Sequence, residues 1–125
     1  MTEGFSLVLP VALTTPKAAR DAVAARFGAE PRCGDLLLCI SEVVTNAVRH
    51  AGTVASMTVS REYDILTVEV ADSSPELPVK RPPSTFAVTG RGLRILDQLA
   101  SRWGARRTAD GKVVWFEFDL AERVS

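Results

Sequence analysis

Two polar side chains that could take part in chemistry, Glu42 and Asn46, lie four residues apart in a stretch with helical periodicity. Residues at this spacing lie on the same side of a helix, about one turn from each other. A carboxylate can act as a general base, and an amide oxygen is a hard ligand suited to Mg²⁺. The pair predicts either part of a magnesium-dependent site or, as the ordinary alternative, the solvated face of an amphipathic helix.

A third polar side chain, Asp72, follows the alternating apolar run 66–71 and precedes a proline-rich stretch. A carboxylate at the end of a strand can accept a hydrogen bond from an exocyclic amine, such as that of adenine. Asp also caps turns frequently, so the alternative is a purely structural role for Asp72.

The run Gly90-Arg91-Gly92 stands directly before an apolar helical segment that begins at Leu93. Glycine lets the backbone approach a ligand closely, and the free amides of a helix N-terminus bind anions. A phosphate group could bind there, with Arg91 as its counter-charge. Ordinary junctions between a loop and a helix also use glycine, so this motif is informative only together with the other two.

The surrounding segments predict the elements that would position these residues. Apolar residues recur over 31–50 at the spacing of a buried helical stripe, which leaves Glu42 and Asn46 on the other side. Prolines interrupt 72–92 and predict a long irregular loop, of a kind that is often functional. The other predicted elements are a helix over 16–27 with Thr15 as N-cap and Gly28 at its end, a helix over 93–99, strands over 5–9, 55–63 and 65–71, and a hairpin of 103–108 with 112–120 around a type I′ turn at Asp110-Gly111.

The composition is that of a folded domain, and we expect residues 1–125 to form one. The chain has 125 residues, of which 46% are hydrophobic, and its 15 Lys and Arg balance its 15 Asp and Glu. The charge balance argues against a general nucleic-acid binder. No apolar run approaches the ~20 residues of a membrane helix, and the N-terminus does not resemble a secretory signal. Cys33 and Cys39 are expected to be reduced, buried thiols of a cytoplasmic protein.

In their order along the chain, the three motifs resemble those of the GHKL ATPase family. The match to the family's N box is the most specific, whereas the matches to its G1 and G2 boxes are short. The small size, the N-terminal helix and the last strand are similar to those of the bacterial anti-sigma-factor serine kinases. The three boxes correspond to residues 41–51, 68–72 and 90–93.

The resemblance implies an α/β (α+β) two-layer sandwich, in which helices cover one face of a mixed, mostly antiparallel sheet, the Bergerat-type ATP-binding fold. It also implies ATP and Mg²⁺ as ligands. Asn46 would coordinate Mg²⁺, Glu42 would be the catalytic base, and Asp72 would hold the adenine amine. Further contacts to the nucleotide would come from Ser74, Gly90, Arg91, Gly92 and Leu93.

The chain departs from the family pattern in its G1 box, which is usually Asp-x-Gly-x-Gly. Here Ser74 and Glu76 replace the two glycines. The side chains limit the approach of the backbone to a nucleotide, and a carboxylate near phosphates would repel them. A Thr common near the adenine, in the last hairpin of the family, is replaced by Val113. These differences weaken the expectation of kinase activity more than that of the fold.

Two functional hypotheses follow from the resemblance. In the first, the chain is an ATP-dependent serine/threonine kinase that phosphorylates an anti-anti-sigma protein and also binds a sigma factor. In the second, it is a non-catalytic anti-sigma or regulatory binding module with weak or lost nucleotide binding. Both imply protein partners and a possible homodimer, without direct contact to nucleic acid or membrane. A third alternative is an α/β domain in which the motifs occur by chance.

Overall fold

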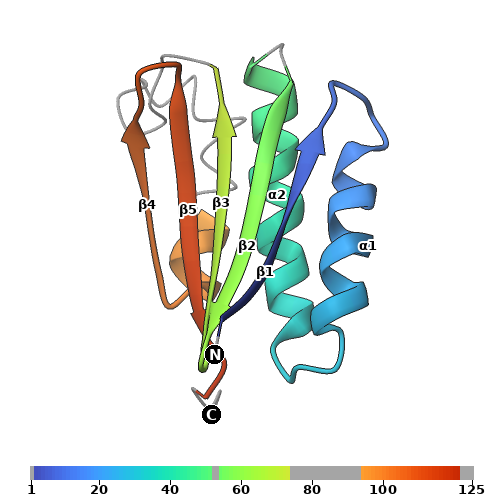
Figure 1. Ribbon diagram of the computed structural model, residues 1–125, viewed down its shortest axis with the longest axis vertical. Helices are drawn as coiled ribbons and strands as arrows, with labels where there is room; N and C mark the ends of the chain where they lie inside the picture. The colour runs from blue at the N-terminus through green and yellow to red at the C-terminus, as the bar shows by residue number, and fades with distance from the viewer. Residues whose placement is uncertain (1, 52–53, 74–93, 122–125) are drawn as a thin grey trace.

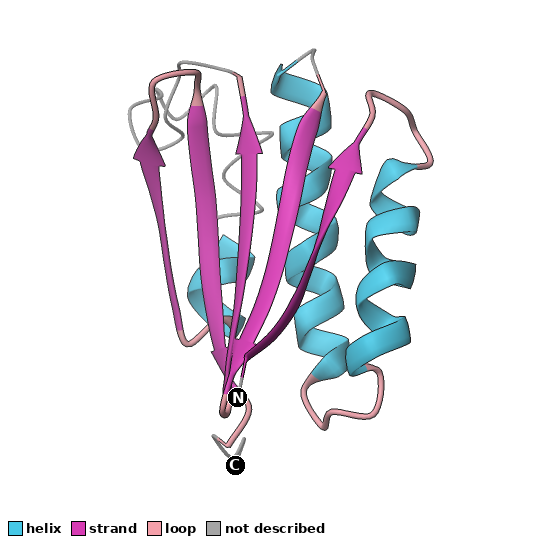
Figure 2. Ribbon diagram, viewed as in Figure 1, coloured by secondary structure: helices cyan, strands magenta, loops and turns pink. Residues whose placement is uncertain are grey.

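The fold of the computed structural model is a five-stranded sheet with the helices packed on one side of it (Figure 1, Figure 2). The structure describes residues 2–51, 54–73 and 94–121. Residues 94–99 form a short helix. The other elements are β1 (Thr2–Leu9), α1 (Thr15–Phe27), α2 (Cys33–Ala51), β2 (Ala55–Glu62), β3 (Ile65–Asp72), β4 (Arg102–Arg107) and β5 (Lys112–Asp119).

The strand order in the sheet is β1-β2-β3-β5-β4, so β1 and β4 form its edges. Each of the four pairings between described strands is antiparallel. The predicted sandwich with helices on one face is therefore confirmed. The sheet was expected to be mixed, but its described strands form no parallel pair.

The core lies between the sheet and the helices, and α2 contributes its predicted apolar stripe. Every second residue of β3 is buried, as expected for a strand with one face against a core. The buried cluster joins side chains of α1, α2 and the sheet, and it includes Leu36, Ile40, Val43, Ala47, Met57, Val59, Leu66, Val68, Val70, Phe116 and Phe118. Burial of each large aliphatic side chain contributes roughly 1.5–3 kcal/mol, so this contact sets the orientation of α2.

The start of α1 differs from the prediction by one residue. Thr15 is the first helical residue and Thr14 the N-cap, whose side chain makes no capping hydrogen bond. The Thr15 hydroxyl instead donates a hydrogen bond of 2.7 Å to the carbonyl oxygen of Pro10. Thr15 thus fixes the connection between β1 and α1, which explains why this threonine is buried.

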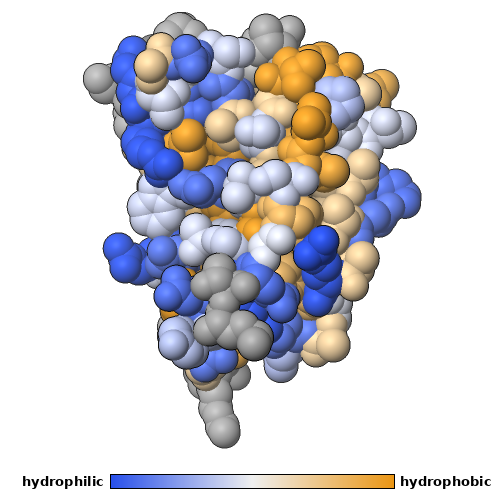
Figure 3. Space-filling model, in the orientation of Figure 1, coloured by the Kyte–Doolittle hydropathy of each residue, from blue (hydrophilic) through white to orange (hydrophobic). Residues whose placement is uncertain are grey.

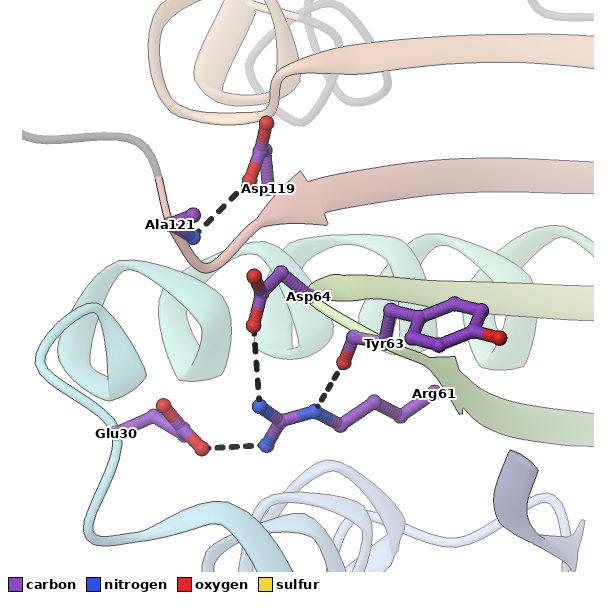
Figure 4. A network of polar contacts seen from close by, with 6 residues as sticks. All are labelled: Glu30, Arg61, Tyr63, Asp64, Asp119 and Ala121. Atoms are coloured by element: carbon purple, nitrogen blue, oxygen red, sulfur yellow. Dashed lines mark hydrogen bonds and ion pairs between the residues drawn. The ribbon is translucent and has the colours of Figure 1, made fainter. Parts of the chain in front are cut away.

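At the lower end of the molecule in Figure 1, a polar network ties the β2–β3 hairpin to the connection between α1 and α2. Arg61 lies between Glu30 and Asp64 and donates a hydrogen bond of 2.8 Å to the carbonyl oxygen of Tyr63 (Figure 4). Tyr63 has a φ of 56°, which the two-residue hairpin link requires. The predicted hairpin near Asp64 is confirmed.

Hydrophobic side chains gather at the upper right of the surface in Figure 3. Exposed hydrophobic residues at the end of β1 and in the connection that follows it are Val8, Val11 and Leu13. None of the helices in the described part of the chain combines the length and the hydrophobicity that a membrane-spanning helix requires.

Both cysteines are buried free thiols, as predicted. Burial raises the pKa of Cys39 to about 12, and the negative charge of Asp35 adds to the effect. Burial, followed by the charge of Glu30, also raises the pKa of Cys33.

The raised pKa of Cys39 predicts a loss of stability in alkaline solution. The unfolded thiol loses its proton near pH 9, whereas the folded thiol keeps it up to about pH 12. Above pH 9 the free energy of unfolding therefore falls, by up to about 1.4 kcal/mol per pH unit for this group. Urea unfolding in the presence of a reductant, between pH 8 and 10.5, should give a steeper loss of stability for the wild type than for Cys39→Ala. Parallel stability profiles of the wild type and Cys39→Ala would contradict the raised pKa of Cys39.

Candidate functional site

Helix α2 presents Glu42 and Asn46 beside its buried stripe, where both side chains are half-buried. The stripe residues that directly follow them in sequence, Val43 and Ala47, are buried. The two polar side chains are therefore neither in the core nor on the most exposed side of the helix. This placement agrees with the prediction of a carboxylate and an amide on the polar side of the helix.

The flank of α2 that carries these residues is the one away from α1. Arg20 of α1 donates a hydrogen bond to the hydroxyl of Ser41, so Ser41 marks the side of α2 that faces α1. At about 100° per residue, Ser41 and Asn46 lie on opposite sides of the buried stripe. Glu42 and Asn46 therefore lie on the side of α2 that faces the half of the sheet formed by β3, β5 and β4 (Figure 1).

Asp72 is the last residue of β3, and its side chain belongs to the face of the sheet that the helices cover. Buried residues alternate along β3 as Leu66, Val68, Val70 and Asp72. Figure 1 shows that α2 and β3 both end at the upper end of the molecule. The side chain of Asp72 thus leaves the sheet toward the helices, at the same end of the molecule as the C-terminal half of α2, which carries Asn46.

The Asp72 carboxylate forms an ion pair with Lys112, at 3.4 Å between Oδ2 and Nζ. Only 2% of the Asp72 side chain and 9% of the Lys112 side chain are exposed. The two residues face each other at the end of the β3–β5 ladder, so their side chains leave the same face of the sheet. A buried carboxylate is costly unless a cation or hydrogen-bond donors compensate it, and Lys112 supplies the cation.

Gly111 allows β5 to start directly beside Asp72. A Cβ atom at position 111 would lie 2.0 Å from the carbonyl oxygen of Asp72 and 2.5 Å from the Cα atom of Ser73. No side chain fits at these distances, so the backbone of the last hairpin packs against the end of β3. This close approach also sets the distance between Asp72 and Lys112.

The prediction of a type I′ turn at Asp110-Gly111 is wrong. β4 ends at Arg107 and β5 begins at Lys112, so the loop has four residues, closed by a hydrogen bond from the Thr108 amide to the Gly111 carbonyl. A type I′ turn requires two residues with positive φ, which neither Asp110 nor Gly111 has. Glycine stands at position 111 because of the contact with Asp72.

Sequence reasoning missed Lys112 as a neighbour of Asp72, and of the last hairpin it placed only Val113 near the adenine, as the replacement of the family's Thr. Val113 pairs with Ala71, one step along the ladder, so its side chain leaves the opposite face of the sheet. The sequence did not indicate that β3 pairs with β5, because a long connection separates the two strands. Phe116 and Phe118 lie an even number of residues from Lys112, so the three side chains leave the same face of β5. These two aromatic residues could therefore have indicated that Lys112 faces the core.

Of the predicted site residues, the structure describes Glu42 and Asn46 on α2 and Asp72 on β3, whose side chain leaves the face of the sheet that the helices cover. Their predicted roles stay predictions, since each depends on a ligand. The remaining predicted contacts lie outside the described residues: Ser74, Gly90, Arg91, Gly92 and Leu93.

The donor set of the described residues fits a magnesium–nucleotide complex better than a metal held by protein alone. Within the described ranges, His, Cys, Asp and Glu side chains form no cluster of three that could hold a metal ion. Mg²⁺ commonly takes one or two protein ligands and completes its shell with phosphate oxygens and water. The half-buried Asn46 can supply one such oxygen.

Comparison with known proteins gives a family match over most of the chain. The sequence model of the histidine kinase-like ATPase domain matches residues 10–118. No curated protein sequence is similar enough to count as a match.

Two solved structures share the fold at low sequence identity. One contains the RsbU and RsbW domains of Rv1364c from Mycobacterium tuberculosis, with 18% identity and a TM-score of 0.65 over 93% of this chain and 32% of that chain. The other is the histidine kinase domain of the blue-light activated histidine kinase EL346 from Erythrobacter litoralis, with 19% identity and a TM-score of 0.54. It is matched over 90% of this chain and 62% of that chain. This chain thus spans about a third of the first and less than two thirds of the second.

The close packing at Gly111 predicts that Gly111→Ala destabilises the protein. A methyl group at 2.0 Å from the Asp72 carbonyl oxygen forces the hairpin away from β3, at a cost of about 1–3 kcal/mol typical of overpacking. Gly34→Ala is a matched control, because a Cβ atom at this exposed position in α2 meets nothing within 4 Å. Urea unfolding should show a lower stability for the first variant and an equal or higher stability for the second. Equal stabilities of Gly111→Ala and wild type would contradict the packing argument.

Proposed function

The chain belongs to the histidine kinase-like ATPase domain family, and we propose that it is an ATP-dependent serine/threonine kinase that acts on a regulatory protein. Membership confirms the resemblance to GHKL ATPases and supports ATP as the ligand. The assignment to the anti-sigma branch, with an anti-anti-sigma protein as the substrate, is part of the proposal.

The arrangement of Asp72, Glu42 and Asn46 is the observation that carries this proposal. An acceptor for an amine lies at the end of β3, while a carboxylate and an amide lie on the flank of α2 that faces the same half of the sheet. A nucleotide bound between them would place its base at Asp72 and its phosphates near Glu42 and Asn46. The order and the spacing along α2 agree with the N box of the family.

The proposed reaction uses the protein mainly to position groups and to accept a proton. Asp72 accepts a hydrogen bond from the adenine amine, and Asn46 provides the protein ligand of Mg²⁺. The metal ion, when bound, offsets the negative charge of the phosphates. Glu42 accepts the proton of the attacking Ser or Thr hydroxyl as its oxygen bonds to the γ-phosphorus and the bond to ADP breaks. The half-buried position of Glu42 supports this role, because the carboxylate stays accessible to a hydroxyl of another protein.

We further propose a sigma factor as a second, competing protein partner, a cytoplasmic location and a homodimeric assembly. Phosphorylation adds about −1.5 to −2 charges to the substrate and can therefore change which partner is bound. The charge balance of the chain agrees with protein partners rather than nucleic acid.

A binding module without phosphoryl transfer is the second candidate function. It is favoured by Ser74 and Glu76, which replace the glycines of the family's G1 box. In this alternative the domain sequesters its partner, and nucleotide binding is weak or lost. The two functions differ in one measurable property, namely the transfer of phosphate from ATP to the partner.

The role of Glu42 predicts that Glu42→Gln lowers the rate of phosphoryl transfer by about 10²–10⁴-fold, the usual contribution of a general base. The amide keeps the size of the side chain, so ADP affinity should change by less than about threefold, within the error of such comparisons. The measurement is the transfer of radiolabelled phosphate from ATP to candidate anti-anti-sigma proteins. Glu62→Gln at the exposed end of β2 serves as the control. Equal transfer rates of Glu42→Gln and wild type would rule out Glu42 as the base.

The role of Asn46 predicts that Asn46→Ala weakens ATP binding only through the metal ion. Calorimetry should show a reduced affinity for ATP with Mg²⁺, by about tenfold or more, as for loss of a charge-assisted contact. The affinity for adenosine, which lacks phosphates, should not change. A similar loss for both ligands would indicate that the substitution perturbs the fold and not the metal site.

A further inference from the structure

Arg32, directly before α2, contacts the short helix of residues 94–99, which lies far from it in sequence. Its Nη2 atom donates a hydrogen bond of 2.6 Å to the carbonyl oxygen of Leu99, the last residue of that helix. The guanidinium carbon lies 4.7 Å from the ring centroid of Phe118 in β5, and Nη2 lies 3.6 Å from Oδ2 of Asp35 in α2. Only 9% of the Arg32 side chain is exposed, so a buried cation joins α2, β5 and the short helix.

The helix of residues 94–99 depends on contacts with other elements. An isolated helix of this length is marginal in water, because nucleation costs more than a few backbone hydrogen bonds return. Leu96 is fully buried in the same cluster as Leu36 and Ile40 of α2. The last carbonyl groups of a helix lack partners within it, and a positive charge is favourable at this end. Arg32 supplies both a donor and a charge there, so we expect it to fix the position of the helix against α2.

The short helix covers part of the half of the sheet that Glu42 and Asn46 face. Figure 1 shows it in orange behind β3 and β5, beside the lower half of α2. Asp72 lies at the upper end of β3, where the ladder with β5 and the contact with Gly111 hold it. In the proposed function the phosphates lie near Glu42 and Asn46, whereas the base lies at Asp72. A shift of the short helix would therefore affect the phosphate end of the site before the base end.

We propose that Arg32 is a positioning residue of the nucleotide site, which holds the helix of residues 94–99 at the phosphate end. The inference rests on the proposed function, in which a nucleotide with Mg²⁺ binds beside α2. Arg32 acts through the helix and does not touch the nucleotide. The planar guanidinium stacks on Phe118 while it donates to the Leu99 carbonyl, a combination that the point charge of a lysine does not reproduce.

The experiment compares Arg32→Met with the wild-type chain by calorimetry, with ADP in the presence of Mg²⁺ and with adenosine. Methionine keeps an unbranched apolar side chain but lacks the donor and the charge. The affinity for ADP should fall by about fivefold or more, because part of the binding energy is then spent on fixing the helix. The affinity for adenosine, which lacks phosphates, should change by less than about threefold. The amides of residues 96–101 should exchange hydrogen faster in the variant, because the helix opens more easily.

Arg61→Met is the matched control. Arg61 is also an arginine that contacts the connection between α1 and α2, through its ion pair with Glu30, but it belongs to the β2–β3 hairpin (Figure 4). Its loss should lower the stability of the protein and change the affinity for ADP by less than about threefold. If Arg32→Met does not fold, Arg32→Lys takes its place. It keeps the charge but not the planar group, and the same selective loss of ADP affinity is expected.

The outcomes separate the inference from the function beneath it. If the Arg32 variant binds ADP as the wild type does, or if hydrogen exchange of residues 96–101 is unchanged, the role of Arg32 is wrong and the proposed function stands. Equal losses for ADP and adenosine, or an equal loss of ADP affinity in Arg61→Met, would indicate a general loss of structure and would also overturn the inference. If the wild type binds neither ADP nor ATP, the proposed function fails and takes the inference with it.

Discussion

The contact between the apolar stripe of α2 and the sheet is the constraint on which the candidate site depends. Leu36, Ile40 and Val43 are buried in one cluster with the inner face of β2 and β3. A rotation of α2 by one residue, about 100°, would expose part of this stripe and bury Glu42. Each exposed aliphatic side chain would cost roughly 1.5–3 kcal/mol, which is far more than polar contacts on the helix surface could return. Hydrophobic packing thus determines where the carboxylate and the amide lie.

The parity of β3 and β5 places the second half of the site. Side chains alternate between the two faces of a strand, so the burial of Val68 and Val70 directs Asp72 toward the helices as well. The same rule directs Lys112 inward, since Phe116 and Phe118 of β5 are buried. Asp72 and Lys112 form the last pair of the β3–β5 ladder, after the buried apolar residues of both strands. Their position depends on the same core as that of Glu42 and Asn46, although they belong to different elements.

Local periodicity made most of the fold predictable from the sequence. The helix around Glu42 and the strand before Asp72 were predicted nearly to the residue, because one-sided burial leaves a regular pattern of apolar side chains. Features that depend on contacts between distant segments were not predictable. Thr15 bonds to Pro10 instead of capping its helix, because tertiary geometry decides which backbone oxygen its hydroxyl meets.

The neighbour of Asp72 was hidden for the same physical reason. The start of β5 is apolar on both faces, with Val113 and Val114 in succession, so the face of Lys112 is indicated only by residues further along the strand, Phe116 and Phe118. The Asp110-Gly111 dipeptide suggested a tight turn, whereas the glycine is required by a contact with the end of another strand. Register between strands far apart in sequence is set by packing, and only the three-dimensional structure shows it.

Stability alone does not account for the buried pair of Asp72 and Lys112. Replacement of a buried ion pair by apolar residues of similar volume is often neutral or stabilising, by about 1–4 kcal/mol. The surroundings would suit such a replacement, because Val70 and Phe116 continue the same face of the two strands toward the core. A carboxylate at this place can accept hydrogen bonds from a ligand, whereas an apolar pair cannot. Under the proposed function, in which Asp72 receives the adenine amine, the charge of Asp72 has a role that its contribution to folding does not supply.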